Sequence, residues 1–337
     1  MSFNVEANNS TEPTPALDPR RYEKIEQANL ESWYLTQGYR PFEAFQSFAS
    51  AGPARVDISK LSAKELAETA AAKRVITGGN MSPLGPYGPI EMTDEQRVND
   101  AKDNMAKLFE SLSISAESVH MLFPERDYTT PLTVIDIDAQ PDEENTTFPR
   151  RVSTSGDFIY TRDSNKILAA RPADCPIMFA SADTPEGKIY MLVHYAWQGA
   201  ANHYVEQTAV ALNALGVDTN SMNIYLTPGG QAENYPYTNY PEDPRVRFPD
   251  TEGLFVNVVE KTNEDGAKVW DFSIDTPKFV YDQVIKKIGV DPTQVFCDTS
   301  DTSALNSGYS SHGRSRRLAD QGESNTRDIV IMRPAAH

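Results

Sequence analysis

Cysteine is scarce in this sequence, whose 337 residues include only Cys175 and Cys297. Two thiols exclude a disulfide scaffold and are typical of a reducing compartment, where thiols serve in metal binding or catalysis. Residues 1–19 contain neither a basic leader nor an apolar run, so we expect no signal peptide. No apolar stretch approaches the roughly 20 residues that a membrane helix needs. We therefore expect a cytoplasmic protein that does not associate with a membrane.

Positive charge is also in short supply. The chain has 31 Lys and Arg against 48 Asp and Glu, which gives a formal net charge of −17. Nucleic acids and anionic membranes are bound through clustered Lys and Arg, so neither is an expected partner. An anionic ligand would need a local arginine. We expect a small-molecule substrate, and the sequence makes no prediction of the oligomeric state.

Familiar nucleotide and metal motifs are missing as well. No GxGxxG follows a predicted strand and no GxxxxGK[ST] occurs, so dinucleotide and P-loop binding have no sequence support. There is likewise no CxxC and no HExxH. A metal site in this chain would have to be assembled from dispersed residues.

The pattern of short apolar runs predicts many strands and few helices. We expect strands over 118–123, 132–138, 157–161, 166–170, 176–181, 188–196, 223–227, 294–298 and 328–332, a hairpin over 254–274, and helices over 199–215 and 277–289. Residues 228–250 and 299–326 are expected to be loops. This order of elements indicates an α+β fold, a layered mixed β-sheet sandwich with flanking helices.

The chain divides into three parts by composition. Residues 1–19 are expected to be a disordered tail, and residues 20–74 a helical N-terminal extension. That extension contains two helical segments between Tyr22 and Phe48 and a helix after the capping box Ser62–Glu65. Residues 75–337 form the main domain, in which a second capping box at Thr93–Gln96 opens a helix that runs to about Leu112.

Cys175 and His194 are the first candidates for chemistry. Cys175 precedes the strand 176–181, and His194 lies toward the end of the strand 188–196, so antiparallel pairing of the two strands would bring them together. His120 lies in a similar strand. One thiolate and two imidazoles are a common zinc donor set, and three ligands with one open position are the catalytic pattern. The alternatives are a small hydrophobic cysteine and histidines that belong to the core. We interpret Cys297 as a structural thiol.

Several motifs in order resemble one family. The segments STSGDFIYT, KILAARPADCPIMFAS and GKIYMLVHYAWQGAA are similar to the GDA, ADC and VHAGWRG motifs of the family named laccase-domain, polyphenol oxidase, purine nucleoside phosphorylase or peptidoglycan-editing-factor proteins. GGNMSPLGPYGP, SVHMLF, SGYSSHGRS and NTRDIVIM extend the resemblance over about 75–335. The resemblance implies a laccase-domain-like α/β catalytic domain over 75–337.

The resemblance also implies a site. The family's zinc ligands fall on His120, Cys175 and His194, with Asp174 in a position to orient a ligand. His312 and Arg314 are candidates for acid–base catalysis and anion contacts. The implied function is that of a zinc-dependent enzyme acting on purine nucleosides, by phosphorolysis of the glycosidic bond or by deamination of adenosine.

Three other functions stay open at this point. A metal-independent cysteine hydrolase or deamidase would use Cys175 as nucleophile and His194 as base. A catalytically degenerate binding protein would keep the fold, with or without the metal, and would have lost catalysis. A copper-dependent phenol oxidase is a further alternative, although multicopper centres draw on many imidazoles and this chain has five histidines. Copper in the same three ligands would then be adventitious.

The sequence departs from the family where arginine is usual. Gln198, Met105 and Gly313 stand at three such positions, and the segment PGGQAENYPYT replaces the family's GPxIGPCCYEV. Arginine binds phosphate in a bidentate geometry that glutamine cannot reproduce. Phosphorolysis is therefore the part of the family function that these departures put in question. The aromatic segment 235–244 is either a wall of the substrate site or a surface excursion.

Overall fold

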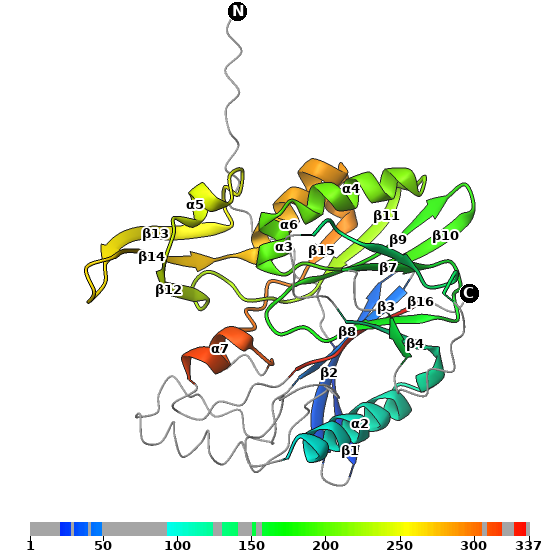
Figure 1. Ribbon diagram of the computed structural model, residues 1–337. Helices are drawn as coiled ribbons and strands as arrows, with labels where there is room; N and C mark the ends of the chain where they lie inside the picture. The colour runs from blue at the N-terminus through cyan, green and yellow to red at the C-terminus, as the bar shows by residue number, and fades with distance from the viewer. Residues whose placement is uncertain are drawn as a thin grey trace, which may run out of the picture.

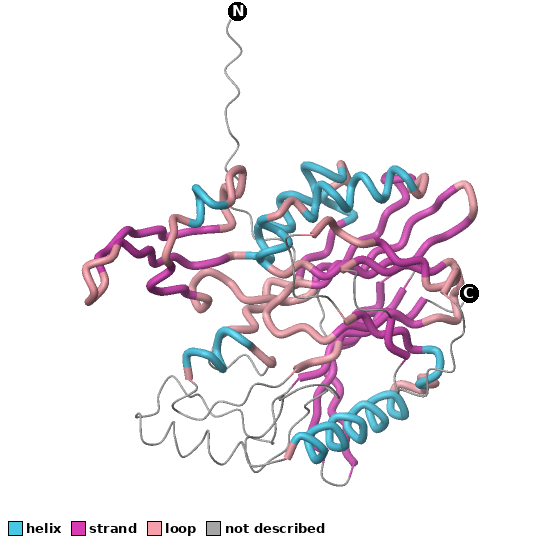
Figure 2. Tube along the Cα trace, in the orientation of Figure 1, coloured by secondary structure: helices cyan, strands magenta, loops and turns pink. Residues whose placement is uncertain are grey.

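The computed structural model describes residues 21–27, 30–39, 42–48, 93–123, 130–140, 150–152, 157–304, 309–318 and 327–334. Two β-sheets lie face to face with helices on their outer sides, and a third, smaller sheet projects from one end (Figure 1). The helices cover the outer faces of both large sheets (Figure 2). No helix in these ranges is both long enough and apolar enough to cross a bilayer. The expected α+β sandwich of mixed sheets with flanking helices is confirmed.

The first large sheet has six strands in the order β15-β11-β9-β10-β7-β5. They are β15 (Val295–Cys297), β11 (Asp218–Leu226), β9 (Ile177–Thr184), β10 (Gly187–His194), β7 (Phe158–Thr161) and β5 (Val134–Asp136). Its outer face is covered by α3 (Trp197–Ala201), α4 (Tyr204–Ala214) and α6 (Thr276–Gln283), which continues as the π-helical turn η3 (Val284–Ile288). The 3-10 turn η4 (Pro292–Gln294) leads into β15.

The second large sheet has seven strands in the order β1-β2-β3-β16-β8-β4-β6. They are β1 (Arg21–Gln27), β2 (Leu30–Tyr39), β3 (Phe42–Phe48), β16 (Val330–Pro334), β8 (Ile167–Ala170), β4 (Val119–Leu122) and β6 (Arg150–Val152). Helix α2 (Asp94–Ser111) packs on its outer side and is followed by the 3-10 turn η2 (Ala116–Ser118). The expected capping box opens α2, because the Thr93 side chain accepts from the Gln96 amide at 3.2 Å.

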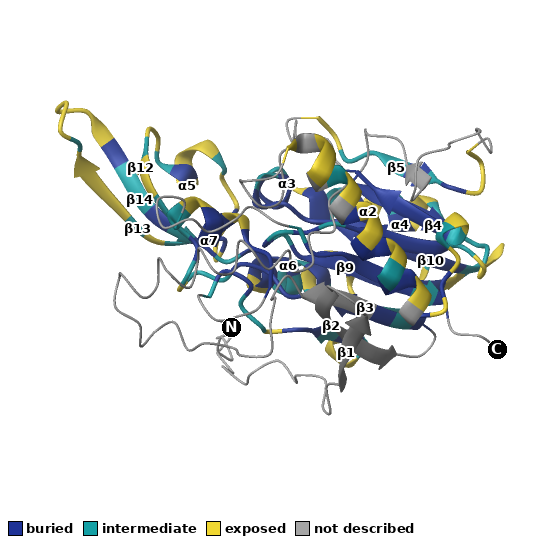
Figure 3. Cartoon of the chain, turned by 90° about the horizontal axis from the view of Figure 1, so that it is seen from below, coloured by how far each residue is buried: buried dark blue, intermediate teal, exposed yellow. Residues whose placement is uncertain are grey.

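The layer between the two sheets is one continuous apolar core. Strand alternation sends every second side chain into it, and the buried residues there include Leu122, Ile159, Leu168, Ile177, Phe179, Tyr190, Leu192 and Val330. The intervening residues face the helices instead. Figure 3 shows the strands of the large sheets as largely buried, and it shows exposed residues on α2, on the outer turns and at the tip of the β13–β14 hairpin.

The projecting sheet consists of β12 (Pro236–Tyr240), β14 (Lys268–Ile274) and β13 (Phe255–Thr262), with α5 (Pro244–Arg247) beside it. Trp197 of α3 holds it to the main body, because its ring meets Tyr237 edge to face at 5.7 Å and Phe255 at 5.9 Å. The sheet is therefore attached at the end of β10, where α3 begins.

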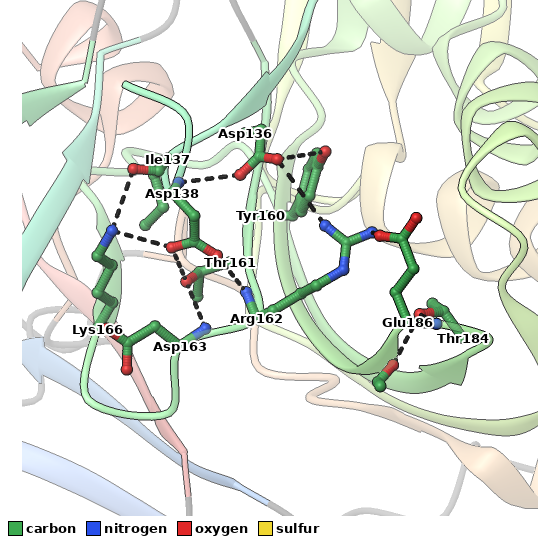
Figure 4. A network of polar contacts seen from close by, with 11 residues as sticks. Asp136, Ile137, Asp138, Tyr160, Thr161, Arg162, Asp163, Lys166, Thr184 and Glu186 are labelled. Atoms are coloured by element: carbon green, nitrogen blue, oxygen red, sulfur yellow. Dashed lines mark hydrogen bonds and ion pairs between the residues drawn. The ribbon is translucent and has the colours of Figure 1, made fainter. Parts of the chain in front are cut away.

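A polar network closes the opposite end of the six-stranded sheet (Figure 4). Asp138 accepts hydrogen bonds from Thr161 Oγ1 at 2.7 Å, the Arg162 amide at 2.7 Å and Lys166 Nζ at 2.9 Å. The Arg162 guanidinium forms an ion pair with Glu186, in the turn between β9 and β10, with Nη2 and Oε2 2.8 Å apart. This network fastens the edge strand β5 to β7 at the end of the sheet away from His194.

Several predictions of secondary structure are wrong. Residues 22–48, expected to be helical, form β1, β2 and β3, because β3 pairs antiparallel with β16, with Phe42 opposite Pro334. The helix expected over 199–215 is two helices, separated at His203, whose φ is +64°. The expected loops 228–250 and 299–326 contain β12, α5 and the helix α7 (His312–Arg317). Strand β6 has no counterpart in the expected elements. The tail 1–19, the capping box at Ser62 and the segment 78–89 lie outside the described residues.

Candidate active site

Cys175 and His194 meet at the rim of the six-stranded sheet, as the sequence predicts. Strands β9 and β10 pair antiparallel, with His194 opposite Ile177, and the amide of Tyr195 donates to the Pro176 carbonyl at 3.0 Å. The Cys175 thiol lies close enough to His194 to raise the pKa of the imidazole. A short hairpin thus brings the thiol and the imidazole together.

Asp157 holds the other side of the His194 ring. Its Oδ1 lies 2.8 Å from His194 Nδ1, and its carbonyl accepts from the His194 amide at 2.8 Å. His194 is 6 % exposed and Asp157 is 5 % exposed. Burial lowers the pKa of His194, but the hydrogen bonds with Asp157 and Cys175 raise it more strongly, to about 10. With Nδ1 bound to the carboxylate, Nε2 is the nitrogen available to the thiol or to a metal.

Sequence reasoning missed Asp157. The residue directly precedes β7, whose pairing with β10 places Phe158 opposite Val193 and therefore Asp157 beside His194. The available signal was the motif GDFIYT, in which this carboxylate comes immediately before the apolar run. The contact between Asp157 and His194 depends on the pairing of two strands that are distant in the sequence, so no local residue spacing predicts it.

His120 lies on β4 in the facing sheet. Its neighbours Val119 and Met121 face α2, whereas Leu122 faces the layer between the sheets, so alternation directs His120 into that layer. By the same rule His194 follows Tyr190 and Leu192 into the layer from the other side. Within the described ranges, no three His, Cys, Asp or Glu side chains are gathered closely enough to hold a metal ion. The structure therefore joins Cys175 and His194 and directs His120 toward the same layer.

Asp174 organises the loops around Cys175. It is buried, has a φ of +75°, and its carboxylate accepts from Thr302 Oγ1 at 2.6 Å, Ser311 Oγ at 2.9 Å and the Gly313 amide at 2.6 Å. Its carbonyl accepts from the Gly230 amide at 2.9 Å. Asp174 thus connects the segment that leads into β9 to the Thr302 loop and the start of α7 through its carboxylate, and to the Gly230 loop through its backbone carbonyl.

The two candidates in α7 have different surroundings. Arg314 is buried, and its guanidinium donates to the carbonyls of Thr302 at 3.1 Å, Ala304 at 2.9 Å and Tyr309 at 2.5 Å. These contacts are typical of a residue that shapes a loop. His312, the first residue of α7, is exposed and its carbonyl accepts from Ser315 Oγ at 3.0 Å.

The aromatic segment 235–244 begins beside Asp174 and Cys175 and continues into the projecting sheet. Tyr235 is buried, and burial raises its pKa well above the usual range, with smaller contributions from Tyr237, Asp174 and Cys175. Tyr237 accepts from Trp197 Nε1 at 3.1 Å, and the Arg316 guanidinium lies 4.1 Å from its ring centroid. The sequence left open whether this segment is a wall of the substrate site or a surface excursion, and neither alternative is tested here, since Tyr235 is buried whereas residues 238, 239, 241 and 242 are exposed.

Gly313→Ala is expected to destabilise the protein. A Cβ at this position would lie 2.1 Å from Tyr235 Cε2 and 2.2 Å from Cδ2, so the ring or the helix would have to move. Overpacking of this kind costs about 1–3 kcal/mol in the free energy of unfolding, measurable by urea denaturation. If the cause is the Tyr235 ring, adding Tyr235→Ala will cost less than the sum of the two single changes. Strict additivity would contradict this explanation.

Cys297 differs from Cys175 in its environment. It is buried in β15, and burial raises its pKa to about 12, so its thiol stays protonated at neutral pH. This is the behaviour expected of a structural thiol. Cys175, which is partly exposed, is the thiol that lies beside an imidazole.

Comparisons with known proteins agree with this architecture. The family model described as multi-copper polyphenol oxidoreductase laccase matches residues 85–324. The crystal structure of hypothetical protein YfiH from Bacillus licheniformis superimposes with a TM-score of 0.60 at 14 % identity, covering 95 % of this chain and 100 % of that one. YlmD from Geobacillus stearothermophilus gives a TM-score of 0.59 at 15 % identity, covering 93 % and 100 %. No curated protein matches. At these identities the structural likeness concerns the fold.

Proposed function

We propose that this chain is a zinc-dependent enzyme acting on purine nucleosides. The premise is its membership of the family described as multi-copper polyphenol oxidoreductase laccase, to which it belongs. The observation that carries the proposal is the relay in which Asp157 holds the buried His194 ring and His194 lies beside the partly exposed Cys175. The reaction takes place at the glycosidic bond or at the amino group of the purine.

The donor set fits a zinc ion. Cys175 and His194 would supply two ligands and His120 the third, and thiolate with imidazole is a donor combination that zinc prefers. A carboxylate on the second nitrogen of a ligating histidine fixes the ring and raises its basicity, and Asp157 is in this position. Bound zinc would polarise a substrate oxygen and lower the pKa of a bound water toward about 7.

The other residues have roles that follow from their contacts. Asp174 and Arg314 position the loops around Cys175, and we assign neither of them a direct contact with substrate. His312 is the candidate general acid or base, because it is exposed at the start of the helix that Asp174 anchors. Tyr235 and Tyr237 supply the aromatic surface that a purine base would contact.

The substrate class is tested by product analysis. We expect the zinc-loaded protein to convert adenosine, inosine or guanosine to a product that chromatography separates, and the Cys175→Ser variant to convert none of them. Cys297→Ser, which changes a buried thiol on another strand, is the matched control and should remain active. Equal activity of wild type and Cys175→Ser would contradict the assignment of the site.

A metal-independent thiol enzyme is the second candidate, and a specific observation favours it. Cys175, His194 and Asp157 follow one another as thiol, imidazole and carboxylate, which is the arrangement of a nucleophile, its base and the group that orients the base. The copper alternative has less support. His203 directly precedes α4, where its ring lies 3.7 Å from Glu206, and His312 begins α7 on another part of the chain.

Chelation separates the two candidates. If zinc is required, prolonged treatment with a strong chelator will abolish nucleoside turnover, and adding back zinc will restore it, because the ligands remain in place without the metal. The measurement is the initial rate before treatment, after treatment and after zinc is added. Turnover that survives chelation yet disappears in Cys175→Ser would show that the thiol is the nucleophile.

A further inference from the structure

The ring of Tyr237 is fixed by its neighbours. It stacks on Phe272, with ring centroids 5.4 Å apart and an interplanar angle of 4°. Its hydroxyl accepts a hydrogen bond from Trp197 Nε1 at 3.1 Å, and the buried Tyr235 ring meets it in a T-shaped contact at 5.8 Å. Tyr237 itself is only half-buried. It therefore forms a rigid aromatic surface that does not turn aside to make room for another group.

The exposed side chain of Arg316 covers this ring. Its Cζ lies 4.1 Å from the centroid of Tyr237, and its Nη2 donates to the Pro236 carbonyl at 3.1 Å. Phe272 packs on Tyr237 from within the projecting sheet, whereas Arg316 comes from α7, the helix whose start Asp174 anchors. A cation from the candidate site's own helix thus lies on an aromatic surface of the neighbouring sheet.

The contacts that keep Arg316 over Tyr237 are weak. Among the residues that the structure describes, no carboxylate forms an ion pair with Arg316. Like charges lie nearby: burial lowers the pKa of Arg317, and the positive charges of Arg314 and Arg316 add to this decrease. An exposed cation–π contact changes an equilibrium constant by a factor of about two to five. Arg316 is therefore the movable part of the contact, and Tyr237 is the fixed part.

Tyr237 is one ring away from the candidate active site. Tyr235 lies between them, because burial raises its pKa, with smaller contributions from Tyr237 on one side and from Asp174 and Cys175 on the other. A ligand that reacts beside Cys175 and carries a flat ring beyond Tyr235 would therefore meet Tyr237 and its covering guanidinium. A nucleobase and a guanidinium are both flat groups that stack on an aromatic face, so they compete for this position.

We propose that Arg316 is a displaceable cover of the purine-binding surface: its guanidinium occupies the face of Tyr237 on which the base of the substrate stacks, and it moves into solvent when the base binds. This rests on the proposed action on purine nucleosides. The protein must uncover the ring before a base can stack, so the cover lowers the affinity for every ligand that uses Tyr237. It leaves the affinity for zinc unchanged, because a metal held by Cys175 and His194 does not use that ring.

Calorimetric titration of the zinc-loaded protein with hypoxanthine tests the cover, since this purine base has neither a glycosidic bond nor an amino group to react. Arg316→Ala should bind the base about two- to fivefold more tightly than the wild type. Arg247→Ala is the matched control, because its guanidinium lies over another ring, that of Phe248 at 5.3 Å, and it should bind as the wild type does. Unchanged or weaker binding by Arg316→Ala would overturn the inference and leave the action on nucleosides intact. Absence of binding in every variant would also overturn it, and the conversion of nucleosides would then be decided separately by product analysis.

A double-mutant cycle shows whether Arg316 acts through the ring of Tyr237. Tyr237→Leu removes the stacking surface, so Arg316→Ala should give no further gain in this background, whereas it should keep its gain beside Tyr240→Leu, an aromatic change on the same strand. Tyr237→Phe keeps the ring and should keep the gain, and it decides the point if circular dichroism shows that Tyr237→Leu does not fold. A gain that persists beside a folded Tyr237→Leu, or that is lost beside Tyr237→Phe, would overturn the inference.

Discussion

Asp157→Asn is expected to weaken zinc binding about 10- to 100-fold, the usual cost of removing the carboxylate behind a ligating histidine. The amide keeps the size of the side chain but loses the charge that fixes the His194 ring at 2.8 Å and increases its basicity. The measurement is a competition titration against a chromophoric chelator at fixed pH. The loss of nucleoside turnover at limiting zinc should follow the loss of affinity and recover when zinc is in excess.

Asp138→Asn is the matched control for this experiment. Asp138 belongs to the polar network at the opposite end of the same sheet, where it accepts from Thr161 and Lys166 (Figure 4). We expect this change to lower the free energy of unfolding and to leave the affinity for zinc as it is. Equal zinc affinity in wild type and Asp157→Asn would remove His194 from the proposed ligands.

Asp174→Ala is expected to lower the free energy of unfolding by about 4 kcal/mol, because hydrogen bonds to a charged group contribute about 1.5–3 kcal/mol each and are not additive. The change leaves the buried hydroxyls of Thr302 and Ser311 and the amide of Gly313 without their acceptor. It also puts alanine at a φ of +75°, where a Cβ is strained. Urea denaturation followed by circular dichroism measures the loss.

Asp291→Ala provides the comparison for Asp174. The Asp291 carboxylate accepts from the Thr293 amide at 2.8 Å in an exposed turn, so its removal should cost about 1 kcal/mol, as for an ordinary helix cap. A loss at Asp174 no larger than the loss at Asp291 would mean that Asp174 does not hold the loops around Cys175 together.

Local sequence patterns predicted the part of the site that depends on neighbouring strands. Alternation identified β9 and β10, and the short turn between them forces Cys175 and His194 to the same rim. The strand pattern also supplied His120 as the third candidate, which the motif resemblance supported, and its direction follows from the alternation of β4. These inferences needed no information about pairing between distant segments.

The elements that were missed depend on such distant pairing. Asp157 reaches His194 because β7 joins the far side of β10. Helix α7 has six residues, and its start is anchored by Asp174, which is 137 positions from Ser311 in the chain. The apolar spacing in residues 22–48 is compatible with helices. The segment forms three strands instead, because β3 pairs with β16. In each case a tertiary contact decides between local alternatives.

The most direct test of the proposed zinc site is the metal content of the purified protein beside its Cys175→Ser and Cys297→Ser variants, measured by elemental analysis after dialysis against trace zinc. The site predicts about one zinc per chain in the wild type and in Cys297→Ser, as expected for three ligands on one ion, and little or none in Cys175→Ser. Zinc that is absent from the wild type, or retained in full by Cys175→Ser, would contradict it.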